Sequence, residues 1–105
     1  MIRPIAHLLL HLIVPGAAAR WVDSERWKTA WLIMIATMLV DLDHLLADPI
    51  YNPNRCGIGF HPLHTYAALT TYAVLCAIPR ARLVGLGLLI HMALDGLDCV
   101  WMRFA

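Results

Sequence analysis

Four apolar stretches alternate with short polar connectors along the chain. The apolar stretches are residues 4–19, 29–47, 62–79 and 83–102. Each is close to the roughly 17 to 25 residues that cross a bilayer as a helix. Because backbone polar groups cannot stay unpaired in lipid, the pattern predicts helices rather than a sheet. We expect one all-α domain, residues 1–105, that forms an integral membrane bundle of four helices running up, down, up and down.

The composition agrees with a membrane protein. Hydrophobic residues make up 61% of the chain and charged residues 14%, against about 45 to 50% and about 25% in soluble domains. A small soluble enzyme and a disordered tail are therefore excluded. A net charge of +1 provides no field for nucleic acid, so we expect no such partner. The first stretch imitates a secretory leader, but its two histidines favour a retained span.

The ionisable residues gather in or at the ends of the apolar stretches. All six histidines and five of the seven acids lie there, although each costs a few kcal/mol to insert in a membrane. Such residues face inward by default and mark function. Their spacings of three or four residues place each set on one stripe of its helix. The sets are His7 with His11, Asp41 with His44, His61 with His64, and His91 with Asp95 and Asp98.

Chain direction brings these stripes to one end of the predicted bundle. In an alternating bundle, the starts of the first and third helices lie level with the ends of the second and fourth. At about 1.5 Å per residue, all four sets fall within roughly 15 Å of the membrane face that bears the N-terminus and the C-terminus. We therefore expect one shared polar site near that face.

Imidazole and carboxylate together suit Zn²⁺, Fe²⁺ or Mn²⁺, and helical bundles build di-metal sites from such inward pairs. The candidate metal ligands are His7, His11, Asp41, Asp43, His44, His61, His64, His91, Asp95 and Asp98. Ten ligands exceed the need of one ion, so we expect two divalent ions, zinc foremost, with iron and manganese as alternatives. The remaining residues would orient the ligating histidines. The competing interpretations are a metal-free hydrogen-bonded core and, less fitting with so many carboxylates, bis-histidine haem.

The motifs together resemble a known group of proteins. The series is His7-x3-His11 with Pro15, Asp41-Leu42-Asp43-His44, residues 55–64 (RCGIGFHPLH), and His91-x3-Asp95-x2-Asp98-Cys99. It resembles a small bacterial family of four-span membrane proteins of unknown function. That family is similar to the membrane-bound metal-dependent hydrolases, including the LexA-binding inner-membrane hydrolases. The resemblance covers nearly the whole chain and implies a metal-dependent hydrolase in the bacterial inner membrane, with the ten residues above as its metal-site positions.

A mechanism follows from the candidate ligands. Two carboxylate-bridged ions would activate water and stabilise charge on a phosphoryl or acyl oxygen. Asp43 lies about 200° around a regular helix from Asp41, so both cannot point straight inward. We expect Asp43 to complete the second ion or to act as the catalytic base; the alternative is an Asp43 that faces headgroup water. Arg55, the one cation in its loop, is either a substrate-binding residue for an anionic headgroup or an interfacial anchor.

Cysteines and basic residues bear on the compartment. Cys56 and Cys99 fall on the ligand face and would pair in an oxidising compartment, but we slightly favour free thiols. Arginine and lysine number five on the opposite face against three on the ligand face, which favours a cytoplasmic basic face and a site open to the periplasm.

Three functions stay open for the predicted site. They are a hydrolase of a lipid or lipid-linked phosphoester, a di-iron redox protein, and a non-enzymatic metal-binding subunit. The expected partners are membrane lipids and a lipid-like substrate, with a homo-oligomer or a larger membrane complex as further alternatives.

Overall fold

Helices make up nearly all of the described structure. The computed structural model describes residues 2–48 and 55–104, and contains no strand within them. Four α-helices alternate with three 3₁₀ segments. In chain order they are α1 (Ile2–Val22), α2 (Trp27–Ala36), η1 (Thr37–Leu46), η2 (Pro62–His64), α3 (Tyr66–Ala77), η3 (Pro79–Ala81) and α4 (Arg82–Phe104). The expectation of an all-helical protein is therefore confirmed.

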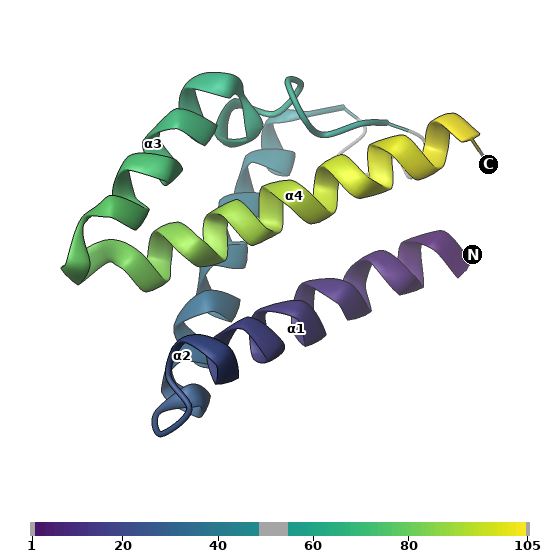
Figure 1. Cartoon of the computed structure of the whole chain (residues 1–105). Helices are drawn as coiled ribbons and strands as arrows, with labels where there is room; N and C mark the ends of the chain where they lie inside the picture. The colour runs from purple at the N-terminus through teal and green to yellow at the C-terminus, as the bar shows by residue number, and fades with distance from the viewer. Residues whose placement is uncertain (1, 49–54, 105) are drawn as a thin grey trace.

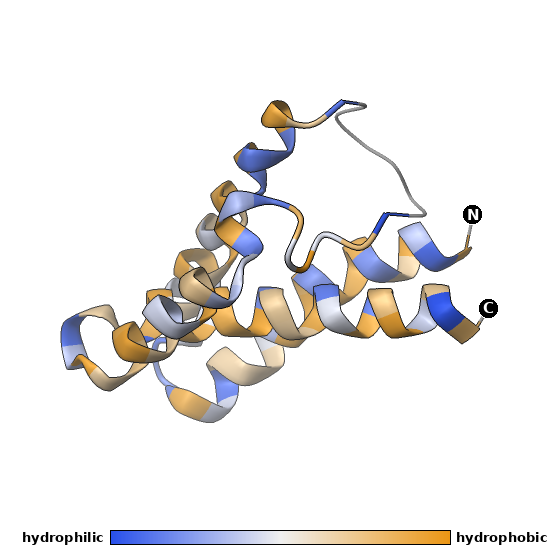
Figure 2. Cartoon of the chain, turned by 90° about the horizontal axis from the view of Figure 1, so that it is seen from above, coloured by the Kyte–Doolittle hydropathy of each residue, from blue (hydrophilic) through white to orange (hydrophobic). Residues whose placement is uncertain are grey.

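The helices α1 and α4 run side by side in opposite directions, so the two ends of the chain lie near each other (Figure 1). The α2–η1 segment runs obliquely behind them and contacts both, while α3 packs on α4 alone among the α-helices (Figure 1). Hydrophobic residues predominate along the helices (Figure 2). This arrangement places η1, η2, α1 and α4 around one region between the helices.

The second predicted helix changes its winding partway. Residues 37–46 form a 3₁₀ helix rather than a continuation of α2, and at its start the Thr37 hydroxyl donates to the Met34 carbonyl. A 3₁₀ helix has three residues per turn, so positions three apart lie on one face. Accordingly, Thr37, Val40 and Asp43 are buried, whereas every third residue from Leu39 is exposed.

The third predicted helix is shorter than expected. Residues 62–79 do not form one helix, because Thr65 is extended and its side chain accepts from the Ala68 amide to cap α3. The 12 residues of α3 extend about 18 Å, against a hydrocarbon core of about 30 Å. Three helical stretches of the described chain are long and apolar enough to cross a membrane: Ile2–Val22, Trp27–Leu46 and Pro79–Phe104.

Two small apolar clusters hold the helices together. Val40, Tyr72, Leu88 and Met92 join η1, α3 and α4. A second cluster, Ala19, Ala30 and Met34, joins α1 to α2. Large apolar side chains elsewhere are exposed, among them Leu39, Leu42 and Leu45, each at least 60% accessible. The fold thus keeps a narrow core and turns most of its hydrocarbon outward, as lipid-facing helices do.

Candidate metal centre

Nine of the ten predicted ligands form a continuous polar cluster, in three groups that offer donor atoms within 4.8 Å of one another. The N-terminal group is His7, His11 and Asp95; the central group is Asp41, His64, His91 and Asp95; and the loop group is Asp43, His44 and His61. The four-residue spacings on α1 and α4 turn each pair toward the other helix. The tenth residue, Asp98, is in none of these groups.

Asp95 connects the N-terminal group to the central group. Its Oδ1 atom lies 3.1 Å from His7 Nε2 and 3.2 Å from His11 Nε2. Its Oδ2 atom lies 3.0 Å from His64 Nε2 and 3.1 Å from His91 Nε2. Each carboxylate oxygen therefore faces a different pair of imidazoles. This is the arrangement that a carboxylate bridging two ions requires.

The central group brings two imidazole nitrogens and two carboxylate oxygens into one small space. Asp41 Oδ1 lies 3.0 Å from His91 Nε2 and 3.2 Å from His64 Nε2, and the two Nε2 atoms lie 3.1 Å apart. His64 Nδ1 donates to Asp43 Oδ2 over 2.8 Å, so in a neutral His64 the Nε2 atom carries a lone pair. That lone pair points at the carboxylates of Asp41 and Asp95. A shared cation would relieve the repulsion between this lone pair and the two carboxylates.

His11, in the N-terminal group, also directs a ring nitrogen without a hydrogen toward a carboxylate. Its Nδ1 atom lies 2.8 Å from the His7 carbonyl oxygen; because a carbonyl only accepts, Nδ1 carries the hydrogen. The Nε2 atom is then a bare acceptor that faces Asp95 Oδ1. It is buried and has no hydrogen-bond partner among the described residues. The donor set therefore fits a metal ion, which binds imidazole through such a lone pair.

Asp43 lies behind His64 rather than on the water side. It is 4% exposed, and its Oδ2 atom accepts both His64 Nδ1–H and the Leu63 amide, the latter over 2.9 Å. The alternative in which Asp43 faces headgroup water is therefore wrong. The 3₁₀ winding explains the change, because at about 120° per residue Asp41 and Asp43 flank a common direction instead of opposing each other.

The loop group joins the end of η1 to the residue before η2. The imidazoles of His44 and His61 are stacked with centroids 3.8 Å apart, and His44 Nδ1 lies 3.3 Å from Asp43 Oδ1. Burial lowers the pKa of His61, and the neighbouring His44 acts in the same direction. The neutral form, which is the one that binds metals, is thereby favoured. His61, one of the predicted ligands, is buried and belongs to this group.

Asp98 has a different partner from the one predicted. Both of its carboxylate oxygens lie 3.0 Å from Arg3 Nη1, and its nearer contact to the cluster is 3.9 Å, from Oδ1 to His7 Nδ1. The guanidinium of Arg3 therefore binds the carboxylate of Asp98, which the spacing on α4 predicted to be a metal ligand. Arg3 was the residue that sequence reasoning missed. The Arg3–Asp98 pair could have been predicted from the antiparallel order of the first and last helices, because this order brings the first turn of α1 beside the last turns of α4.

The loop over the cluster is tied to α4 by a disulfide between Cys56 and Cys99, so the expectation of free thiols is wrong. Their Cα atoms lie 5.1 Å apart, a separation that a disulfide accommodates. Arg55 places its guanidinium over the Phe60 ring, 4.6 Å from the centroid. This contact is compatible with either role predicted for Arg55. Asp48 is exposed two residues beyond the end of η1.

The chain matches the model of a family of unknown function, DUF6122, over residues 1–102. It belongs to this family. The match agrees with the predicted resemblance to a family without known function, and it carries no information on kinship with metal-dependent hydrolases. Neither the curated proteins nor the solved structures contain a match to the chain.

Proposed function

We propose that this protein is a membrane-embedded, dinuclear metal-dependent hydrolase of phosphoesters. One observation carries the proposal: the two oxygens of Asp95 face two different pairs of histidine nitrogens, at 3.0 to 3.2 Å. The first ion would be held by His7, His11 and Asp95. The second would be held by Asp41, His64, His91 and Asp95.

The donor spacings support ions rather than a metal-free polar core. Neighbouring ligands bound at about 2.0 to 2.2 Å lie roughly 2.8 to 3.1 Å apart in octahedral geometry and roughly 3.3 to 3.6 Å apart in tetrahedral geometry. In the central group the imidazole and carboxylate atoms are separated by 3.0 to 3.2 Å. Without an ion, the Nε2 lone pair of a neutral His64 would face the carboxylate oxygens of Asp41 and Asp95, an acceptor against acceptors. One divalent ion satisfies all four donors together.

The chemistry follows from the residues around the two ion positions. Bound divalent ions would lower the pKa of a coordinated water toward about 7 and stabilise charge on phosphoryl oxygens. Asp41, the most accessible carboxylate of the central group with 38% of its side chain exposed, is placed to accept the proton of the attacking water. As the water oxygen bonds to phosphorus, the ester P–O bond breaks and the leaving oxygen takes up a proton. Asp43 holds His64 in its ligating tautomer.

The location of the cluster supports a substrate that approaches from a membrane surface. The three apolar stretches are long enough to span. His7 and His11 lie in the first half of α1 and Asp95 in the second half of α4, which are the halves nearer the two chain termini (Figure 1). A disulfide on that side forms and persists in an oxidising compartment. We therefore propose a bacterial inner-membrane protein of bundle-like arrangement whose site opens to the periplasm. Zinc is the proposed metal, since a His and Asp set with an open position is its usual catalytic environment.

Metal analysis tests the centre residue by residue. Protein purified without a metal-affinity resin is expected to hold about two ions per chain, as bridged sites do. His7→Ala should remove one ion and His91→Ala the other, whereas Asp95→Ala should lower both, because only Asp95 belongs to the two groups. Glu25→Gln, an exposed acid in the loop after α1, is the matched control and should retain wild-type metal. Equal metal content in wild type and Asp95→Ala would contradict the centre.

Activity tests the hydrolase itself. Metal-loaded protein should release phosphate from phosphoester lipids, and Asp41→Ala should abolish the release. If metal is bound but no ester is cleaved, the redox protein or the metal-binding subunit replaces the hydrolase. Mössbauer spectra of ⁵⁷Fe-grown protein then identify the redox alternative, because they distinguish iron at the site from zinc.

A further inference from the structure

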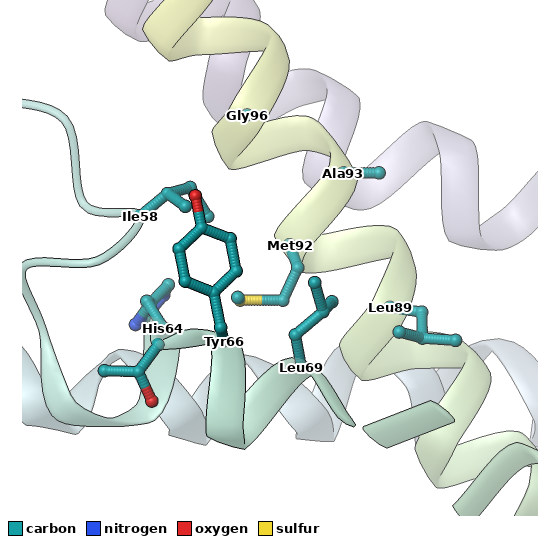
Figure 3. A pocket seen from close by; sticks show the side chains of 9 residues that line it. Ile58, His64, Tyr66, Leu69, Leu89, Met92, Ala93 and Gly96 are labelled. Atoms are coloured by element: carbon teal, nitrogen blue, oxygen red, sulfur yellow. The ribbon is translucent and has the colours of Figure 1, made fainter. Parts of the chain in front are cut away.

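An apolar cavity of about 210 Å³ lies beside the central group, between α3, α4 and the loop before η2. Its walls are Ile58, Leu69, Leu89, Met92, Ala93 and Gly96, with His64, Thr65 and Tyr66 completing it (Figure 3). His64 is fully buried, so the cavity meets the metal centre at this ring. Apart from His64, Thr65 and Tyr66, the residues that line the cavity have apolar side chains or none.

We infer that this cavity binds one hydrocarbon chain of a phosphoester lipid whose headgroup lies at the metal centre. The inference rests on the proposed function and assigns its substrate class. A water-soluble phosphoester has no group that complements this surface, whereas an alkyl chain that moves from the bilayer into the cavity stays in an apolar environment and leaves no polar group unpaired. The volume is below the roughly 300 to 1,000 Å³ of sites that enclose a whole drug-sized ligand. It therefore fits one branch of a lipid rather than the whole molecule.

The mouth of the cavity is placed to receive a chain from the bilayer. Tyr66, which lines the cavity next to Ile58 (Figure 3), is 76% exposed, and the lining residue Ala93 is exposed on α4. The wall residues of α4 belong to the stretch Pro79–Phe104, which is long and apolar enough to cross a membrane. A lipid can thus enter sideways from its own leaflet without exposing its chain to water. Tyr66, at the interface of chain and headgroup, suits the polar end of such a ligand.

Gly96 is the position at which this inference can be tested. A Cβ atom built there meets no heavy atom within 4 Å, although Gly96 lines the cavity. Gly96→Leu should therefore fill the cavity without distorting α4, and Gly96→Ala is the matched control. Ala93→Leu, on the same wall, is a second variant in case the first does not fold.

The experiment uses vesicles of phosphatidylcholine containing phosphatidic acid with a diazirine in one acyl chain. After irradiation, mass spectrometry should find the label on residues 89–96 in Gly96→Ala, and the yield should fall about tenfold in Gly96→Leu, as expected when bulk excludes a chain. The ratio of phosphate release from dioleoyl phosphatidic acid to that from 4-nitrophenyl phosphate should fall by a similar factor.

The outcomes separate the two proposals. Equal labelling of residues 89–96 in Gly96→Leu and Gly96→Ala, with metal content retained in both, would overturn the chain-binding site. Selective labelling without phosphate release from either substrate would overturn the hydrolase and leave the lipid site standing. Leu97→Phe adds bulk to an exposed position of α4 outside the cavity, and it should change neither readout.

Discussion

Asp41 and Asp43 are two residues apart and meet different partners. Asp41 faces the imidazoles of His64 and His91 directly, whereas Asp43 contacts the far nitrogen of His64. A carboxylate in the second position fixes the tautomer of a ligating histidine and raises its basicity. In the proposed metal centre, Asp41 would be a ligand of the ion, and Asp43 would orient the ligand His64.

Removing the orienting carboxylate should weaken metal binding without abolishing it. Asp43→Ala is expected to lower metal affinity by about 10- to 100-fold, the usual effect of losing such a partner. Asp43→Asn should lose less, because its amide oxygen still accepts the His64 Nδ1–H bond. Chelator competition followed by elemental analysis measures both. Asp48→Ala is the control, because Asp48 is an exposed acid beyond the end of η1. If Asp43→Ala and Asp48→Ala bind metal with equal affinity, Asp43 does not contribute to the metal centre.

At the scale of elements, the close approach of α4 to the α2–η1 segment positions the ligands. A Cβ atom at Gly87 would lie 2.8 Å from Thr37 Oγ1 and 3.0 Å from Met34 Cα. Only glycine allows this contact, which lies one helical turn before His91. The same contact holds η1 against α4, and so it fixes the distance from Asp41 to Asp95.

Gly87→Ala should therefore destabilise the protein even though alanine favours helices. We expect a loss of about 1 to 3 kcal/mol from overpacking, seen as a lower Tm in detergent and as weaker metal binding. Gly96→Ala lies on the same helix with open space around its Cβ position, and it should be stabilising by up to about 1 kcal/mol. A Tm for Gly87→Ala at or above that of wild type would contradict the close contact between α4 and the α2–η1 segment.

At the scale of the whole molecule, charge and the disulfide point to the same orientation. Arg26 and Lys28 belong to the connection between α1 and α2 and the first turn of α2, and Arg80 belongs to η3. These segments lie at the end of the molecule opposite the two chain termini (Figure 1), whereas the Cys56–Cys99 disulfide joins the loop before η2 to the last turns of α4. A cytoplasmic position suits the former and an oxidising compartment the latter. The two arguments are independent, since one rests on loop charge and the other on a covalent bond.

Cysteine labelling tests this orientation. In a chain whose three native cysteines are replaced by serine, Phe60→Cys should react with a membrane-impermeant maleimide in intact cells, because it lies beside the site. Glu25→Cys, in the loop after α1, should react only after the cells are opened. The reverse pattern would place the site in the cytoplasm, where the disulfide would not persist.

Much of the candidate site could be predicted because burial in lipid penalises charge so strongly. The positions of His7, His11, His91 and Asp95 on facing stripes followed from helical spacing and from the antiparallel order of helices. The helix at residues 62–79 was wrong in length because hydropathy does not register Thr65, whose side chain ends one segment and caps the next. The 3₁₀ winding of residues 37–46 also escaped prediction, since the apolar pattern there is compatible with either helix.

The sequence by itself determined that the chain is helical and apolar and that its histidines and aspartates collect at one end, because composition and periodicity report which face of each helix is costly to expose. Only the tertiary structure decided how those groups divide. It turned the two oxygens of Asp95 toward different histidines, placed Asp43 behind His64, paired Asp98 with Arg3 and joined Cys56 to Cys99. These pairings depend on distances between helices, which are fixed by close contacts such as that at Gly87 and by local winding, and no spacing along a single helix records them.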